Sequence, residues 1–182
     1  MSESGLNAAV AKMRADGVPD VAVDTFAYHY RALEAGESGL LPESELEPVA
    51  SLPDFDALPE AGDAPLDRAL ILKLNGGLGT SMGLTGPKSL LEVKPGRTFL
   101  DVVRLQAAQA GVPLVLMNSF ATRSASMAAL GDAAEDFVQS KVPKLRADDL
   151  APVEWPDDPD KEWAPPGHGD LYPSLVASGT LD

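Results

Sequence analysis

Apolar residues recur at helical spacing in two stretches near the start of the chain, 6–15 and 24–35, so that two helices are expected there. Asp24 stands where the N-cap of the second helix is expected. That helix would carry three large side chains on one face: Phe26, Tyr30 and Leu33. Residues 40–65 are rich in proline and acidic residues, which is typical of a wrapping or linking segment. The sequence therefore predicts a helical and proline-rich amino-terminal segment over residues 1–65.

The pattern changes to short apolar runs separated by helical stretches after residue 66. Strands are expected at 69–75, 89–94 and 113–117, an extended segment at 137–142, and helices at 98–110 and 122–130. Thr98 and Asp101 form a weakened capping box, and Gly111 closes the first of these helices. This alternation predicts an α/β fold with a mainly parallel sheet. Residues 172–178 read as the opening of another helix, so we expect a sheet that continues and a chain that is truncated.

The charge balance is strongly acidic, with 14 basic and 28 acidic residues and a net charge of −14. Such a surface repels nucleic acid and anionic membranes, so neither is expected as a partner. Any phosphate must be attracted by a few local cations, backbone N–H groups or a metal. The chain has no cysteine, which excludes disulfides and thiolate metal sites, and no signal-peptide pattern opens it. We expect a cytoplasmic protein.

The most informative segment is a glycine-rich loop at 72–89, LKLNGGLGTSMGLTGPKS, which follows directly on an apolar run. Glycine lets backbone N–H groups approach phosphate oxygens, and a strand end is where α/β proteins bind ligands. Pro87 fixes the backbone before Lys88, the natural phosphate partner. The dinucleotide fingerprint fails because Met82 occupies its third glycine position, which disfavours a nicotinamide-dependent dehydrogenase. The phosphate loop of nucleotide hydrolases fails because Pro87 separates glycine from Lys88. The alternative is a glycine-rich surface turn with an exposed lysine.

The loop also resembles the signature of a known family. Similarity continues in three further blocks: LMNSF at 116–120, FVQSKVPK at 137–144, and 165–170 (PPGHGD) with 178–182. Together these blocks resemble the UTP–glucose-1-phosphate uridylyltransferase family of the eukaryotic type. The resemblance implies a Rossmann-like nucleotidyltransferase domain, of which 66–182 would be the first part. It also implies direct transfer of a uridylyl group from UTP to glucose 1-phosphate, giving UDP-glucose and pyrophosphate.

The same resemblance implies roles for individual residues. Those matched to nucleotide or substrate contacts are Leu74, Asn75, Gly76, Gly77, Lys88, Gln139, Gly167 and His168. Lys88 would bind phosphate and act in catalysis, and Gln139 would read uracil, since an amide offers a donor and an acceptor to an imide edge. Gly167 would lie against the base, and His168 would contact substrate. For Asp170 a loop or N-cap position is expected rather than a metal ligand.

The resemblance also implies Mg²⁺ as cofactor, with its aspartate ligand, a second phosphate-binding lysine and most sugar contacts beyond residue 182. We therefore expect the isolated chain to be inactive. Two alternatives stay open: a pyrophosphorylase for another sugar 1-phosphate, and a non-catalytic nucleotide-binding module. The oligomeric state is not predicted.

Overall fold

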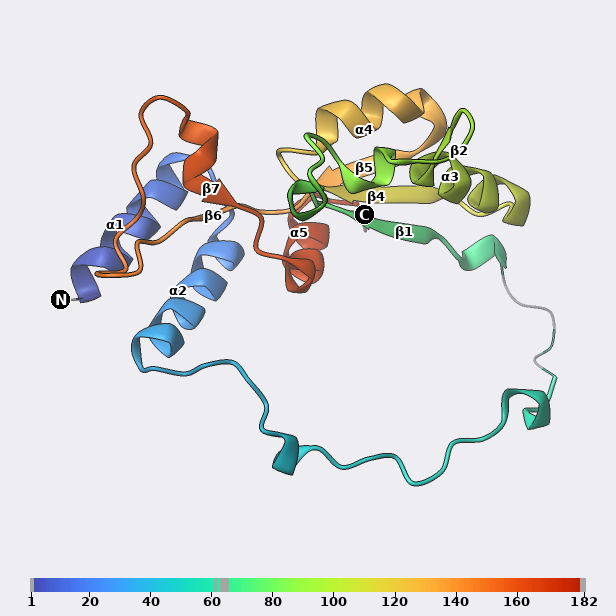
Figure 1. The fold of residues 1–182 in the computed structure, drawn as a ribbon, viewed down its shortest axis with the longest axis horizontal. Coiled ribbons are helices and arrows are strands. Elements are labelled where there is room, and N and C mark those ends of the chain that lie inside the picture. Colours follow the sequence, from blue (N-terminus) through green and yellow to red (C-terminus); the bar gives the residue numbers. More distant parts are fainter. Residues whose placement is uncertain (1, 61, 63–65, 181–182) are drawn as a thin grey trace.

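The computed structural model describes residues 2–60, 62 and 66–180. Its amino-terminal part is a hairpin of two helices, α1 (Ser2–Ala15) and α2 (Asp20–Glu34) (Figure 1). The start expected for the second helix is wrong: α2 begins at Asp20, because Pro19 holds an extended backbone directly before it. Asp24 consequently lies inside the helix and is exposed.

The buried face of α2 is narrower than its apolar pattern suggests. Tyr30 is 2% exposed, and its hydroxyl donates a hydrogen bond to the Leu150 carbonyl oxygen at 3.0 Å. Phe26 packs beside it, whereas Leu33 is 51% exposed. The packed face of the helix therefore ends with Tyr30.

The described residues between α2 and β1 (36–60, 62 and 66–70) belong to a long connection that arches away from the rest of the molecule (Figure 1). In its described part the regular elements are three short 3-10 turns: η1 (Glu43–Glu45), η2 (Phe55–Ala57) and η3 (Leu66–Arg68). Large apolar side chains on it are open to solvent, with Leu40 80% and Phe55 85% exposed. The segment links two packed regions, as its prolines predict.

The centre of the molecule is a three-stranded parallel sheet of β1 (Ile71–Asn75), β4 (Leu114–Asn118) and β5 (Glu135–Val138), in that order. Asn75 lies beside Asn118, and Asn118 beside Val138, so all three strands end at the same edge. The predicted α/β class with a parallel sheet is confirmed. Binding groups that follow these strands are thereby gathered at one edge.

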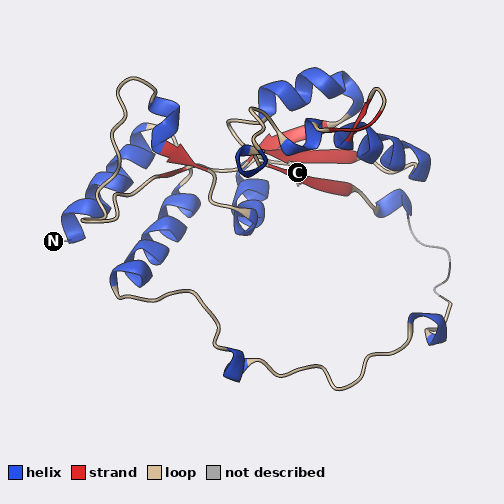
Figure 2. Cartoon of the chain, viewed as in Figure 1, coloured by secondary structure: helices blue, strands red, loops and turns tan. Residues whose placement is uncertain are grey.

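Helices cover both faces of the sheet (Figure 2): α3 (Phe99–Ala110) and α4 (Arg123–Leu130) lie on one face, and α5 (Leu171–Ala177) lies on the other. Alternate residues of β4 supply the two cores, as the pleat of a strand requires. Leu114 and Leu116 pack with Leu100 of α3. Val115 and Met117 pack toward α5. No helix in the described ranges is long and apolar enough to cross a membrane.

The capping box and the terminating glycine predicted for α3 are present in the structure, whereas the strand predicted before it differs. Thr98 Oγ1 accepts from the Asp101 N–H at 3.1 Å, and the Asp101 carboxylate accepts from the Thr98 N–H at 2.8 Å, so the capping box is complete. Gly111 ends the helix with φ of 67°. The strand expected at 89–94 is shorter: β2 (Glu92–Lys94) pairs antiparallel with β3 (Arg97–Thr98), and 88–90 form a 3-10 turn.

The extended segment expected at 137–142 is interrupted after β5. Its second half, β6 (Val142–Pro143), pairs antiparallel with β7 (Trp163–Ala164), and the intervening residues pack against the helical hairpin. Trp163 lies in one core with Met13 and Val23. The helices thus share cores with residues that follow the sheet, and the division into 1–65 and 66–182 stays a prediction.

Candidate functional site

The glycine-rich loop after β1 closes on itself. The Gly79 N–H donates to the Gly86 carbonyl at 3.1 Å, and the Lys88 N–H donates to the Gly77 carbonyl at 3.1 Å. Gly79 has no room for a side chain, since a Cβ there would lie 2.4 Å from Leu84 Cδ1. The closure places Lys88 beside the end of β1.

A buried polar network fixes the start of this loop. The Asn75 side chain donates to Asn118 Oδ1 at 2.7 Å and to Ser126 Oγ at 2.8 Å. Thr122 Oγ1 donates to the Asn75 carbonyl at 2.7 Å, and Ser119 Oγ donates to the Gly76 carbonyl at 3.0 Å. Satisfied buried networks make a local backbone rigid. The peptide groups after β1 are therefore held before any ligand arrives.

A pocket of about 290 Å³ opens at this edge, and we call it the loop pocket. Its lining is Lys73, Leu74, Asn75, Gly76, Gly77, Lys88, Ser89, Met117, Gln139, Pro165, Gly167 and His168. All eight residues that the sequence singled out are among them, from parts of the chain as distant as Leu74 and His168. The structure brings these residues together; the role of each remains a proposal.

Gln139 directly follows β5 and lines the loop pocket. It is 6% exposed, and its N–H donates to the Asn118 carbonyl at 2.8 Å. A Cβ on Gly76 would lie 1.8 Å from Gln139 Nε2, so this placement of the carboxamide requires glycine there. Within the described residues, Gln139 Oε1 is buried without a hydrogen-bond partner. Buried unpaired acceptors are rare in proteins, and this one lies beside a pocket.

Gly167 and His168 also line the loop pocket. Gly167 has φ of 108°, a backbone conformation that residues with a side chain rarely adopt. It precedes the 3-10 turn η8 (His168–Asp170), where His168 is exposed. Asp170 occupies the N-cap position of α5, in agreement with the loop or N-cap position expected for it.

The loop pocket is locally basic although the chain as a whole is acidic. Lys88 is exposed, and Lys73 is half-buried, with a pKa lowered by burial. Neither lysine forms an ion pair with a carboxylate of the described residues, and no carboxylate lines the pocket. Two unneutralised cations and the glycine backbone suit an anion such as a phosphate chain.

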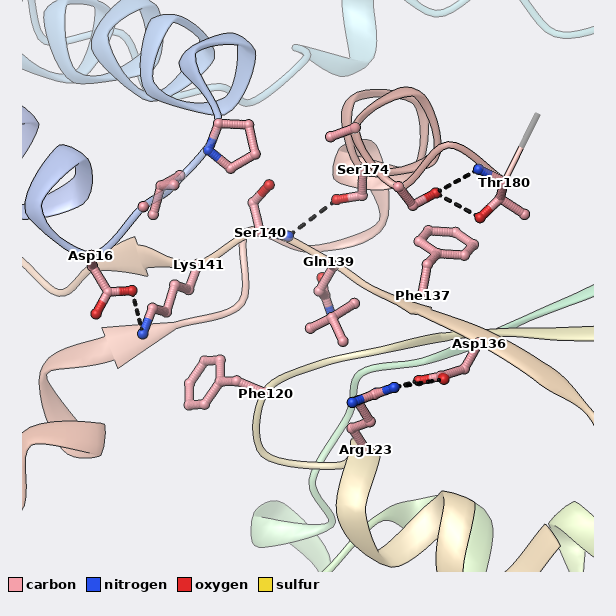
Figure 3. A pocket seen from close by; sticks show the side chains of 16 residues that line it. Asp16, Phe120, Arg123, Asp136, Phe137, Gln139, Ser140, Lys141, Ser174 and Thr180 are labelled. Carbon is pink, nitrogen blue, oxygen red and sulfur yellow. Dashed lines mark hydrogen bonds and ion pairs between the residues drawn. The ribbon is translucent and has the colours of Figure 1, made fainter. Parts of the chain in front are cut away.

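A second pocket, of about 480 Å³, also has Gln139 in its lining (Figure 3), and we call it the hairpin pocket. It is bounded by the turn between α1 and α2, the end of β5 and α5. Two ion pairs line it, Lys141 with Asp16 at 2.6 Å and Arg123 with Asp136 at 2.7 Å. The Arg123 hydrogen bonds hold the pKa of Asp136 below its usual value. The cations of this pocket are therefore neutralised by carboxylates.

Comparison with known families decides where the chain belongs. A family model described as UTP–glucose-1-phosphate uridylyltransferase matches residues 26–182. The chain belongs to this family.

Relatives and solved structures agree with this membership. The UTP–glucose-1-phosphate uridylyltransferase of Solanum tuberosum is 46% identical over 130 residues, covering 64% of this chain and 27% of the relative. That of Encephalitozoon cuniculi is 37% identical over 163 residues, covering 84% of this chain and 33% of the relative. The chain spans about a third or less of these curated relatives.

The fold is shared over almost the whole chain. The UDP-glucose phosphorylase structure from Trypanosoma brucei aligns with a TM-score of 0.86 and 41% identity, over 98% of this chain and 42% of that one. A mutant UDP-glucose pyrophosphorylase from Leishmania major, in complex with UDP-glucose, aligns with a TM-score of 0.85 and 40% identity, over 97% and 40%. The helical hairpin and the parallel sheet thus belong to the uridylyltransferase architecture.

Four residues that line the loop pocket of this uridylyltransferase family member were missed by sequence reasoning: Lys73, Ser89, Met117 and Pro165. Lys73 stands as a lone charge in the apolar run 69–75, a signal that could have been noticed. Ser89 falls in a segment expected to be a strand, and its buried Oγ has no partner among the described residues. Met117 reads as an ordinary core residue.

Proposed function

We propose that the protein containing this chain transfers the uridylyl group of UTP to glucose 1-phosphate, giving UDP-glucose and pyrophosphate. The family and the names of the relatives support this reaction. The single observation that carries it is the convergence of Gln139, Lys88 and the glycine loop on one pocket that no carboxylate of the described residues lines.

In the proposed reaction a phosphate oxygen of glucose 1-phosphate attacks the α-phosphorus of UTP and forms a new P–O bond. The bond between the α-phosphorus and its bridging oxygen breaks, and pyrophosphate leaves with the electron pair. Transfer is direct, so the protein must position two anions and balance their charge. Lys88 and the N–H groups of Gly76 and Gly77 would bind phosphate oxygens. Lys73 would add a second positive charge.

Gln139 would recognise the base. Its carboxamide offers an acceptor and donors, which complement the N–H and carbonyl groups of a uracil edge. The buried Oε1 supports this role, because an amide that already had internal partners would have little to offer a ligand. Gly167, which carries no side chain, would let the base approach the backbone closely.

Nucleotidyltransferases of this kind are generally metal-dependent, and Mg²⁺ is the cofactor we propose. The residues present do not fit it as ligands: proteins usually hold Mg²⁺ through one or two carboxylates, and no carboxylate of the described residues lines the loop pocket. The Asp170 carboxylate already accepts hydrogen bonds from Ser140 and Ser174. In the part of the chain that the structure describes, no group of three or more His, Asp or Glu residues could hold a metal ion. No step is assigned to the metal.

Glucose 1-phosphate is proposed from the relatives' names, and other sugar 1-phosphates are the alternative. A cytoplasmic location is likewise a proposal, supported by the lack of cysteine. We also propose that the 182-residue chain by itself does not make UDP-glucose, since it spans about a third or less of its curated relatives.

The test is titration of the full-length protein with UTP and ATP in the presence of Mg²⁺. Gln139→Ala should lower the preference for UTP over ATP about tenfold, as expected for the loss of one or two neutral hydrogen bonds of about 0.5–1.5 kcal/mol each. Gln109→Ala, an exposed residue of α3, serves as the matched control and should change nothing. Equal affinity of the parent for ATP and UTP would show that the uracil assignment is wrong.

A further inference from the structure

Asp170 is a buried carboxylate that the proposed chemistry does not use. It is 7% exposed and forms no ion pair with a cation of the described residues. Its Oδ2 instead accepts from the Ser140 N–H at 2.6 Å and from Ser174 Oγ at 2.5 Å. Burying a carboxylate without a cation is costly, and hydrogen bonds only partly offset this cost. Such a group is not expected to stabilise the fold, and its presence therefore indicates a role other than stability.

The hydrogen bonds of Asp170 connect two chain segments that line the loop pocket, one containing Gln139 and the other containing Gly167 and His168. Its own N–H donates to the Gly167 carbonyl at 3.2 Å and closes the turn that carries His168. Its carboxylate holds the N–H of Ser140, the residue that directly follows Gln139. Ser174 Oγ also accepts from the Ser140 N–H, at 3.1 Å, an interaction visible beside Gln139 in Figure 3.

We propose that Asp170 is a positioning residue that sets the spacing between Gln139 and the Gly167–His168 turn, and thereby the discrimination of the base. This inference rests on the proposed function, since it concerns how the same pocket selects uracil. Asp170 acts through its neighbours and touches no substrate itself.

The close packing around Gln139 explains why a small displacement of its carboxamide would change base recognition. Its carboxamide lies so close to Gly76 that not even a methyl group fits between them. Its backbone is held on one side by the Asn118 carbonyl and on the other, through Ser140, by Asp170. Misplacement of a recognition group by about 1 Å can cost up to about 10²-fold in rate or affinity. Loss of the Asp170 anchor would let Gln139 shift while leaving the phosphate-binding loop in place.

The test measures the dissociation constants of UTP and CTP, which differ only at the base edge, for the full-length protein. We expect Asp170→Ala to reduce the UTP:CTP affinity ratio about tenfold, with CTP affinity changed by less than about threefold. Asp170→Asn should restore most of the ratio, because an amide oxygen can still accept from the Ser140 N–H. The UTP:CTP affinity ratio of Ser174→Ala should lie between those of the two Asp170 variants. Asp157→Ala, which removes an exposed carboxylate, is the matched control and should leave the ratio unchanged.

Thermal unfolding of each variant separates positioning from stability. A variant that melts earlier but keeps the UTP:CTP ratio would show that Asp170 is structural only, and would overturn the inference. If Asp170→Ala does not fold, unchanged ratios in folded Asp170→Asn and Ser174→Ala would overturn it equally. A parent protein with no preference for UTP over CTP would contradict the proposed function itself. A preference that the parent shows and the variants retain would contradict only the role of Asp170.

Discussion

Two pockets share Gln139 as a common wall, yet only one of them suits an anion. The hairpin pocket is the larger, about 480 Å³ against about 290 Å³ for the loop pocket. Its Lys141 and Arg123, however, are paired with Asp16 and Asp136. The loop pocket has two lysines that no carboxylate of the described residues neutralises. In a chain with a net charge of −14, unpaired positive charge identifies a phosphate site better than volume does.

The largest expected effect comes from removing the exposed cation of the loop pocket. Lys88→Ala should weaken UTP and ATP binding alike by about 10–100-fold, as expected for a charged hydrogen bond of about 1.5–3 kcal/mol. Lys141→Ala, in the hairpin pocket, should change both affinities by less than about threefold, because its charge is already paired. Calorimetric titration of the full-length variants tests this. Equal losses of nucleotide affinity in the two lysine variants would contradict the proposed difference between the two pockets.

A smaller effect is expected from a single methyl group next to Gln139, the residue that both pockets share. Gly76→Ala should lower the preference for UTP over ATP about tenfold, because the new Cβ would displace the Gln139 carboxamide. Gly86→Ala lies in the same loop, where a Cβ meets nothing within 4 Å, and should leave the preference unchanged. Competition binding measures both. A Gly76→Ala protein with unaltered base preference would argue against the close fit.

The smallest effect concerns the stabilising role of an ion pair in the hairpin pocket. Because Arg123 lowers the folded-state pKa of Asp136, their interaction stabilises the protein above the unfolded-state pKa of about 3.9 and is lost as the pH falls through the lower folded value. Arg123→Met should therefore lower the Tm by about 1–3 °C at pH 7, since Arg123 is exposed. The difference should shrink below about pH 4.

Differential scanning calorimetry across pH 3–7 measures this difference. Arg68→Met, at an exposed arginine without an ion pair in the described part of the chain, is the control. A Tm difference that is constant with pH would contradict the assigned pair. UTP affinity should be unaffected in both variants.

Periodicity was sufficient for the order of elements in the sheet region, because strands such as 113–117 are continuous apolar runs between clear turn signals. Periodicity failed at the ends of helices and strands, which depend on adjacent residues and on tertiary packing. Pro19 moves the start of α2, and Leu33 is exposed because the adjacent core ends at Tyr30. The strand expected at 89–94 shortens because Ser89 packs into a 3-10 turn.

The candidate site was predictable where several motifs occur in the order of a known family. Resemblance, rather than local chemistry, singled out Gln139, which taken alone is one glutamine at a strand end. Lys73 was missed because a lone lysine in the run 69–75 does not alter its reading as a strand. The network of Asn75, Asn118 and Thr122 could not be foreseen, since it depends on long-range contacts that the sheet register creates.

The arching connection has a consequence for how the molecule is held together. Its described residues serve as a tether rather than as a support, because the helical hairpin docks through Met13, Val23 and Tyr30 onto residues that follow the sheet. Cleavage of that tether would leave two polypeptides that associate non-covalently through the same apolar contacts. The order in which the two parts are joined is therefore not fixed by the packing, and a circularly permuted or split version of the chain could keep the same docking surfaces.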